Sequence, residues 1–334
     1  MSGATCPWCS APRVSGATCP RCGASYAKAE QIKTQGRATP AAVVAATPAA
    51  VAAATPALAA GAPARAESPL PAQALDGLPG GALDGLPAIE DPVLEWKYCV
   101  GAIPAALLLG IAFHFLTPFL QRTLLAMPVH ELGHAATAWL CGHLAVPIPW
   151  KTLTAETRGF VAPVVLLGAI GFMMYRAHLA ENRALLALGG ALLFVQAAGT
   201  LFIKPKTAEM LIVFGGDGMG MVLAAALMAS FFFGKNTQLY KGSLRWGFLV
   251  IGAAAFVDMF AVWLAARGDF AAIPFGEMEG VGLSDATRLV DDFGWTAESM
   301  VRRHVTLGVC CLAALALVYA WGVRQARRRI GAEN

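Results

Sequence analysis

The segment from Met127 to His134 reads Met-Pro-Val-His-Glu-Leu-Gly-His and contains an HExxH pattern. On a helix, residues four apart lie one turn apart on the same face, so the imidazoles of His130 and His134 can bind one metal ion. Glu131 can then accept a proton from a metal-bound water. The pattern also arises by chance, and the alternative is two buried histidines that hydrogen-bond to their neighbours. We favour the metal site because the surrounding residues are mostly apolar, and ionisable groups in membrane helices are costly and usually functional.

A catalytic zinc ion needs a third protein ligand and an open position for water. The best candidate is Asp217, because the glycines around it (Gly-Gly-Asp-Gly, 215–218) indicate an irregular backbone, which at membrane depth is tolerated only inside the protein or along a cavity. Asp217 could instead cap the helix that follows it. Asp258 is the rival candidate, as a ligand, a partner of a basic group or a protonated structural acid. Glu209 is a weaker candidate, because the lysines near it are typical of a membrane boundary.

Two Cys-x-x-Cys pairs stand at the start of the chain. Four thiolates from two tight turns predict a closed tetrahedral site that stabilises a fold too short to have a core. Two disulfides, or iron in a rubredoxin-like site, are the less favoured alternatives. We therefore expect residues 1–30 to form a zinc ribbon with one structural Zn²⁺, bound by Cys6, Cys9, Cys19 and Cys22. Such a site needs a reducing compartment, so it predicts a cytosolic N-terminus, and we expect the module to bind a protein partner.

Composition indicates a membrane protein. The chain has 334 residues, 57% hydrophobic and only 14% charged, whereas soluble proteins average about 25% charged residues. Residues 31–95 are rich in alanine, proline and glycine, which predicts a disordered linker. The net charge of +4 is small, and a C-terminal arginine run suits the headgroups of a lipid bilayer better than nucleic acid.

Residues 96–334 are expected to form an all-α, multi-pass membrane domain, with a core at 98–234 and extra helices at 246–323. We count seven apolar stretches long enough, or nearly so, to span a bilayer, and the number could be six or eight. They run at about 98–120, 124–148, 159–176, 184–203, 211–234, 246–266 and 304–323. The connections are short except at 267–303, where Ser284 and Thr296 could each cap a short helix.

With these residues in place, the chain resembles the site-2 protease family of intramembrane zinc metalloproteases over roughly residues 98–234. The resemblance implies that His130, His134 and Asp217 bind a catalytic Zn²⁺ and that Glu131 activates the water. It also implies a site within the membrane toward the cytosol, in agreement with an inside N-terminus. The Asp-Gly element departs from the family pattern, because it lacks the preceding Asn-Pro or Pro-Leu that is often seen there.

The resemblance implies zinc-assisted hydrolysis of a peptide bond in a transmembrane protein substrate, with Glu131 as the general base. One alternative is a catalytically silent membrane scaffold that binds a partner through the zinc ribbon. Another is a membrane metalloprotease of the Ste24/HtpX type, in which Glu209 would replace Asp217 as the third ligand. The alanine-, glycine- and arginine-rich composition suggests a GC-rich bacterial genome and hence the bacterial plasma membrane.

Overall fold

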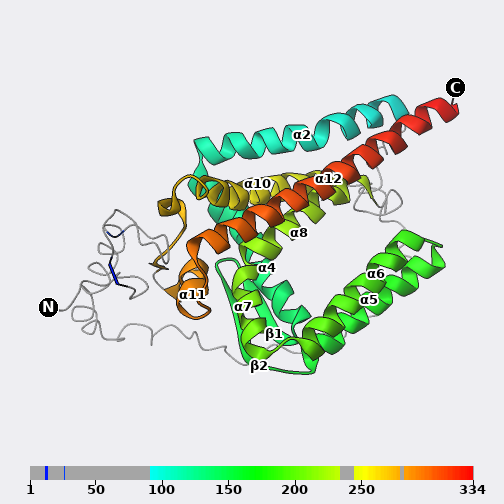
Figure 1. Cartoon of the computed structure of the whole chain (residues 1–334). Coiled ribbons are helices and arrows are strands. Elements are labelled where there is room, and N and C mark those ends of the chain that lie inside the picture. The colour runs from blue at the N-terminus through cyan, green and yellow to red at the C-terminus, as the bar shows by residue number, and fades with distance from the viewer. Residues whose placement is uncertain (1–11, 14–25, 27–90, 234–243, 279–281, 334) are drawn as a thin grey trace, which may run out of the picture.

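The structure is a computed structural model that describes residues 12–13, 26, 91–233, 244–278 and 282–333 (Figure 1). The four cysteines of the expected zinc ribbon, and the expected linker as far as residue 90, lie outside these residues. The described part is mostly helical and contains two short antiparallel hairpins. The expected all-α character of the membrane-type domain is therefore confirmed in its main features, with the hairpins as additions.

The helical elements follow one another along most of the described chain. They are α2 (Pro92–Leu116), α3 (Pro118–Leu120), η2 (Gln121–Ala126), α4 (Met127–Leu140), α5 (Val161–Leu179), α6 (Arg183–Ala197), η3 (Ala198–Phe202), α7 (Pro205–Gly215), α8 (Asp217–Ala229), η4 (Ser230–Phe232), α10 (Leu244–Ala265), η5 (Phe270–Ala272), α11 (Asp285–Asp291) and α12 (Ala297–Glu333). The two hairpins pair β1 (His143–Ile148) with β2 (Lys151–Arg158), and β3 (Glu277–Met278) with β4 (Gly282–Leu283).

Five helical segments of the described chain are long and apolar enough to cross a membrane: α2, α5, α6 together with η3, α10 and α12. The pair α7 and α8 makes a sixth if it is counted as one broken span, bent by 55°. The described residues thus do not form seven continuous spans. Besides the break between α7 and α8, the difference lies at residues 124–148, where α4 has only 14 residues and β1 follows it. Gly142, with φ of 84°, ends the helix in a left-handed turn that favours glycine, and the apolar residues after it form a strand.

Helix α10 lies at the centre of the bundle. It packs against α2 and α8, and α12 lies along α8 and α2 (Figure 1). Buried apolar side chains fill the space between these helices, among them Met221, Leu249, Phe256 and Met259. Close approach depends on small residues, because a Cβ on Gly252 would lie 2.6 Å from the carbonyl oxygen of Ala224.

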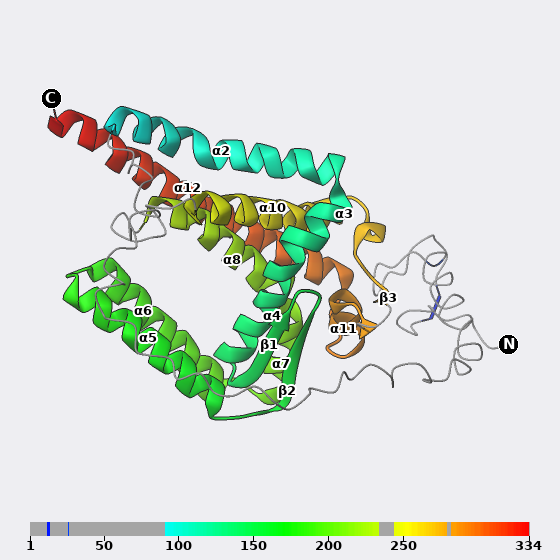
Figure 2. The same ribbon diagram turned by 180° about the vertical axis from the view of Figure 1, so that it is seen from behind.

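Helices α5 and α6 pair with each other and stand apart from this bundle, on the far side of α4 (Figures 1 and 2). Large apolar side chains on the two helices are exposed, including Val165, Phe172 and Phe194. Such a surface is expected of helices whose solvent is lipid rather than water.

The expected caps of the 267–303 segment are confirmed. The Oγ of Ser284 accepts a hydrogen bond from the backbone N–H of Thr287 at 3.3 Å, so α11 begins directly after Ser284. Thr296 stands before α12, and its Oγ1 accepts from the N–H of Ser299 at 3.2 Å. The second of these helices is a long apolar span rather than a short one. The first is short, and its opening residue is Asp285.

Candidate metal centre

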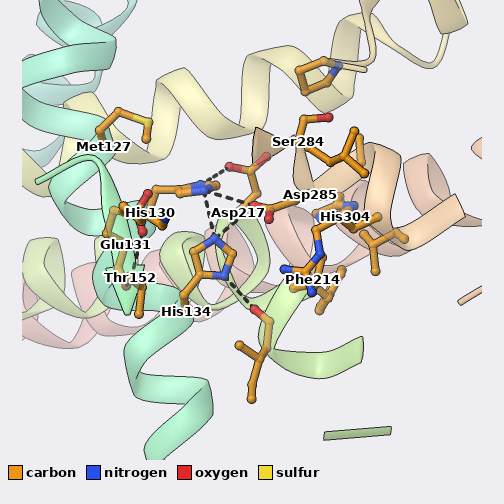
Figure 3. Close-up of a pocket in the computed structure, with 18 of the residues that line it drawn as sticks. Met127, His130, Glu131, His134, Thr152, Phe214, Asp217, Ser284, Asp285 and His304 are labelled. Carbon is orange, nitrogen blue, oxygen red and sulfur yellow. Dashed lines mark hydrogen bonds and ion pairs between the residues drawn. The ribbon is translucent and has the colours of Figure 1, made fainter. Parts of the chain in front are cut away.

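The two histidines of the HExxH pattern lie on one face of α4, as predicted. Their Nε2 atoms are 3.1 Å apart (Figure 3). Helix α4 continues directly from the π-helix η2, because the N–H of Met127 bonds to the carbonyl oxygen of Arg122. Pro128 is its second residue, and His130 and His134 follow one turn apart. The short α4 therefore presents both imidazoles to one point in space.

The break between α7 and α8 is pressed against this face of α4. A Cβ on Gly216 would lie 2.5 Å from Cε1 of His130 and 2.6 Å from Nε2 of His134. On the α4 side, a Cβ on Gly133 would overlap the carbonyl oxygen of Gly215. Both positions therefore require glycine, and the irregular backbone expected beside Asp217 is confirmed.

Asp217 is buried at the first position of α8, and it makes no capping hydrogen bond to that helix. Its Oδ1 lies 2.8 Å from Nδ1 of His130, and its Oδ2 accepts a hydrogen bond from Nε1 of Trp263 at 2.7 Å. The structure thus brings Asp217 to the motif, as predicted. It places the carboxylate on the Nδ1 side of His130, whereas the two histidines converge through Nε2.

The carboxylate that faces both Nε2 atoms belongs to Asp285, the first residue of α11 (Figure 3). Its Oδ2 lies 3.2 Å from Nε2 of His130 and 3.0 Å from Nε2 of His134. Tetrahedral zinc with bonds of about 2.0–2.1 Å has ligand atoms about 3.3 Å apart. One oxygen and two nitrogens spaced by 3.0–3.2 Å therefore fit three corners of a zinc site.

The charges around Asp285 suit a metal ligand. Burial by itself raises the pKa of this carboxyl, but the neighbouring His134 and His130 outweigh burial and hold the pKa well below its usual range. Asp285 is therefore ionised at neutral pH, which is the form that binds a metal.

The outer nitrogen of each histidine also has a partner. Nδ1 of His134 lies 2.7 Å from the carbonyl oxygen of Ile212, and Nδ1 of His130 faces Asp217. A metal-binding histidine usually donates its second ring N–H to a carboxylate or a backbone carbonyl, which fixes the tautomer and the orientation of the ring. When a metal displaces the protons from the two Nε2 atoms and both Nδ1 atoms stay protonated, both Nε2 lone pairs face the space shared with Asp285.

Glu131 is held by the β1–β2 hairpin. Oγ1 of Thr152, on β2, lies 2.8 Å from Oε2 of Glu131 and 2.8 Å from the backbone oxygen of the same residue (Figure 3). A hydroxyl has one proton and donates it to one acceptor at a time. Glu131, Thr152 and the two histidines line one cavity of about 340 Å³, so Glu131 and the histidine pair face the same space.

The remaining acids take other roles. Asp258 pairs with Arg122, its Oδ2 lying 2.8 Å from Nη1 of the arginine, and its Oδ1 lies 3.9 Å from Nδ1 of His114. Of the three roles considered for Asp258, the structure shows the partner of a basic group. Glu209 is exposed on α7 and does not line the cavity, so the ligand that a Ste24/HtpX-type enzyme requires is not supplied by that residue.

Sequence reasoning missed Asp285 and Thr152. Aspartate after a capping serine is common at helix N-termini, so Asp285 carries no signal that separates it from an ordinary first-turn acid. The zinc-ribbon ligands Cys6, Cys9, Cys19 and Cys22 lie outside the described residues, and the structural Zn²⁺ stays a prediction.

Comparison of the chain with protein-family models, with curated proteins and with solved structures finds no match. The resemblance to site-2 proteases therefore rests on the residues of the chain alone.

Proposed function

We propose that the chain is an intramembrane zinc metalloprotease. The observation that carries the proposal is the convergence of His130 Nε2, His134 Nε2 and a carboxylate oxygen at spacings of 3.0–3.2 Å, with Glu131 lining the same cavity. The described part of the chain is mostly helical and contains five helices apolar and long enough to cross a membrane, which supports a membrane-protein substrate.

Each residue of the site has a defined task in this proposal. His130 and His134 would hold the ion, and a zinc ion bound there would supply an activated water and a Lewis acid for the scissile carbonyl. Glu131 takes the proton of the attacking water and passes it to the departing amine. Thr152 holds the Glu131 carboxylate in place, since its hydroxyl is 2.8 Å from Oε2. Two acids, Asp217 and Asp285, are close enough to the histidines to be considered as the third ligand.

The substrate would be a transmembrane protein. A peptide bond inside a helix is shielded by the helix itself, so the substrate has to unwind locally before Glu131 and the metal can reach its backbone. Helix-breaking residues in the substrate would favour this. We place the enzyme in a bacterial plasma membrane with a cytosolic N-terminus. There, a zinc ribbon on a linker would recruit a protein partner or regulate the protease.

The proposal is tested with synthetic transmembrane peptides that do or do not carry a central Gly-Pro pair. Wild type should cleave within the span of the Gly-Pro peptide, and Glu131→Gln should bind zinc normally but cleave nothing. Glu156→Gln is the matched control, because Glu156 is exposed on β2 of the same hairpin. A Glu131→Gln protein that cleaves like wild type would contradict the proposal. A scaffold would keep its cellular role when Glu131 is replaced.

A further inference from the structure

Two carboxylates approach the histidine pair from opposite sides. Asp217 meets His130 at Nδ1, while Asp285 meets both histidines at Nε2 (Figure 3). A single ion bound by both imidazoles has to lie on the side where the Nε2 atoms are 3.1 Å apart. Only Asp285, of these two acids, has an oxygen within 3.2 Å of both Nε2 atoms.

Both oxygens of Asp217 are already engaged. One faces His130 Nδ1 and the other accepts from the indole N–H of Trp263. Trp263 is itself fixed, because its ring stacks on His304 with the ring centroids 3.8 Å apart and the planes parallel. If Asp217 turned to the Nε2 side, a buried indole N–H and the outer nitrogen of a histidine would lose their acceptor, which is unfavourable.

Asp285 is held in position by the docking of α11. Ala286 and Leu289 are buried in an apolar cluster with Trp263 and Trp295. Thr287 links the helix to the preceding chain, because its Oγ1 accepts a hydrogen bond from the N–H of Gly276 at 3.0 Å. The Asp285 side chain is 29% exposed and lines the same cavity as the two histidines and Glu131, so this cavity is open to a water molecule.

We infer that Asp285 is the third protein ligand of the metal, and that Asp217 is a positioning residue which fixes the tautomer and the orientation of His130. The inference rests on the proposed zinc site and deepens it. The third ligand then comes from a short helix between two apolar spans, α10 and α12, rather than from the broken helix pair α7–α8. A bound zinc ion would consequently link α11 to α4, because each helix would supply ligands to it.

Zinc affinity, measured by competition with a chromophoric chelator on the purified full-length chain, tests the inference. Asparagine keeps the size of either aspartate, and at position 217 it can still accept one of the two hydrogen bonds. Asp285→Asn should weaken zinc binding by more than 100-fold. Asp217→Asn should weaken it by at most about 10- to 100-fold, as is usual for an outer partner of a ligand. Asp292→Asn is the matched control, because Asp292 is exposed at the end of the same helix. This variant should bind zinc with the affinity of wild type.

The outcomes separate this inference from the proposed function. If the loss at position 285 is equal to or smaller than the loss at 217, the inference is wrong and the protease proposal stands with Asp217 as the ligand. If a His130→Ala/His134→Ala variant binds as much zinc as wild type, the proposed metal site itself fails.

A second measurement needs only the wild-type chain and therefore does not depend on whether a variant folds. Arg288 is exposed on α11, three residues after Asp285, and offers a trypsin site there. Added zinc should slow tryptic cleavage after Arg288 by at least tenfold. Cleavage after Arg183, which is exposed at the start of α6, should not change. Equal cleavage after Arg288 with and without zinc would overturn the inference.

Discussion

Replacement of Thr152 by valine tests how the general base is positioned. Valine keeps the shape of threonine but removes the hydroxyl that lies 2.8 Å from Oε2 of Glu131. A hydrogen bond to a charged group contributes about 1.5–3 kcal/mol. At about 1.4 kcal/mol for each tenfold change in rate, its loss should lower kcat by roughly 10- to 150-fold if the bond serves the transition state.

The assay is cleavage of the Gly-Pro transmembrane peptide at saturating concentration, together with zinc content. Thr152→Val should lose kcat while it keeps its zinc and its KM, because the hydroxyl touches the base and not the metal ligands. Thr152→Ser should recover most of the rate. Thr157→Val, at an exposed position of the same strand, serves as the control. Unchanged kcat in Thr152→Val would refute the assigned role, and loss of zinc would show that Thr152 acts on the site as a whole.

Three further outcomes follow from the same geometry. Gly216→Ala should abolish histidine-dependent zinc binding, because its Cβ would lie 2.5 Å from the His130 ring, whereas Gly159→Ala meets nothing within 4 Å and should bind zinc like wild type. Asp258→Ala should lower the thermal midpoint of unfolding but leave zinc content unchanged. The substitution removes the ion-pair partner of Arg122. Because the Arg122 side chain is partly exposed, loss of this pair should lower the free energy of unfolding by about 1–3 kcal/mol, less than loss of a fully buried pair. Treatment with a strong chelator should stop peptide cleavage, and added Zn²⁺ should restore it; cleavage that survives the treatment would argue against a metalloenzyme.

Local patterns were sufficient to predict the parts of the site that depend on neighbours in the sequence. The spacing of His130 and His134 fixes their common helix face, and the glycines around Asp217 predict the backbone break. The caps at Ser284 and Thr296 were readable for the same reason, since a cap depends on the next three residues.

The missed features depend on contacts between distant segments. Asp285 reaches His130 across 155 positions, and no local pattern distinguishes it from an ordinary residue at a helix start. Strand β1 lies within the stretch 124–148 that was expected to span the membrane, and β2 lies in the connection after it, because hydropathy does not separate an apolar strand from an apolar helix. Gly142, with its left-handed turn, was the available sign that α4 ends early.

Zinc titration of the metal-free protein during peptide cleavage tests the central claim most directly. Zinc held by a His130→Ala/His134→Ala variant is subtracted, so that only ions in the proposed site are counted. Activity should rise in proportion to occupancy of this site and level off at about one zinc per chain. Glu131→Gln should bind the same amount and stay inactive. Activity that is independent of zinc, or that appears equally in Glu131→Gln, would contradict the assignment of an intramembrane zinc metalloprotease.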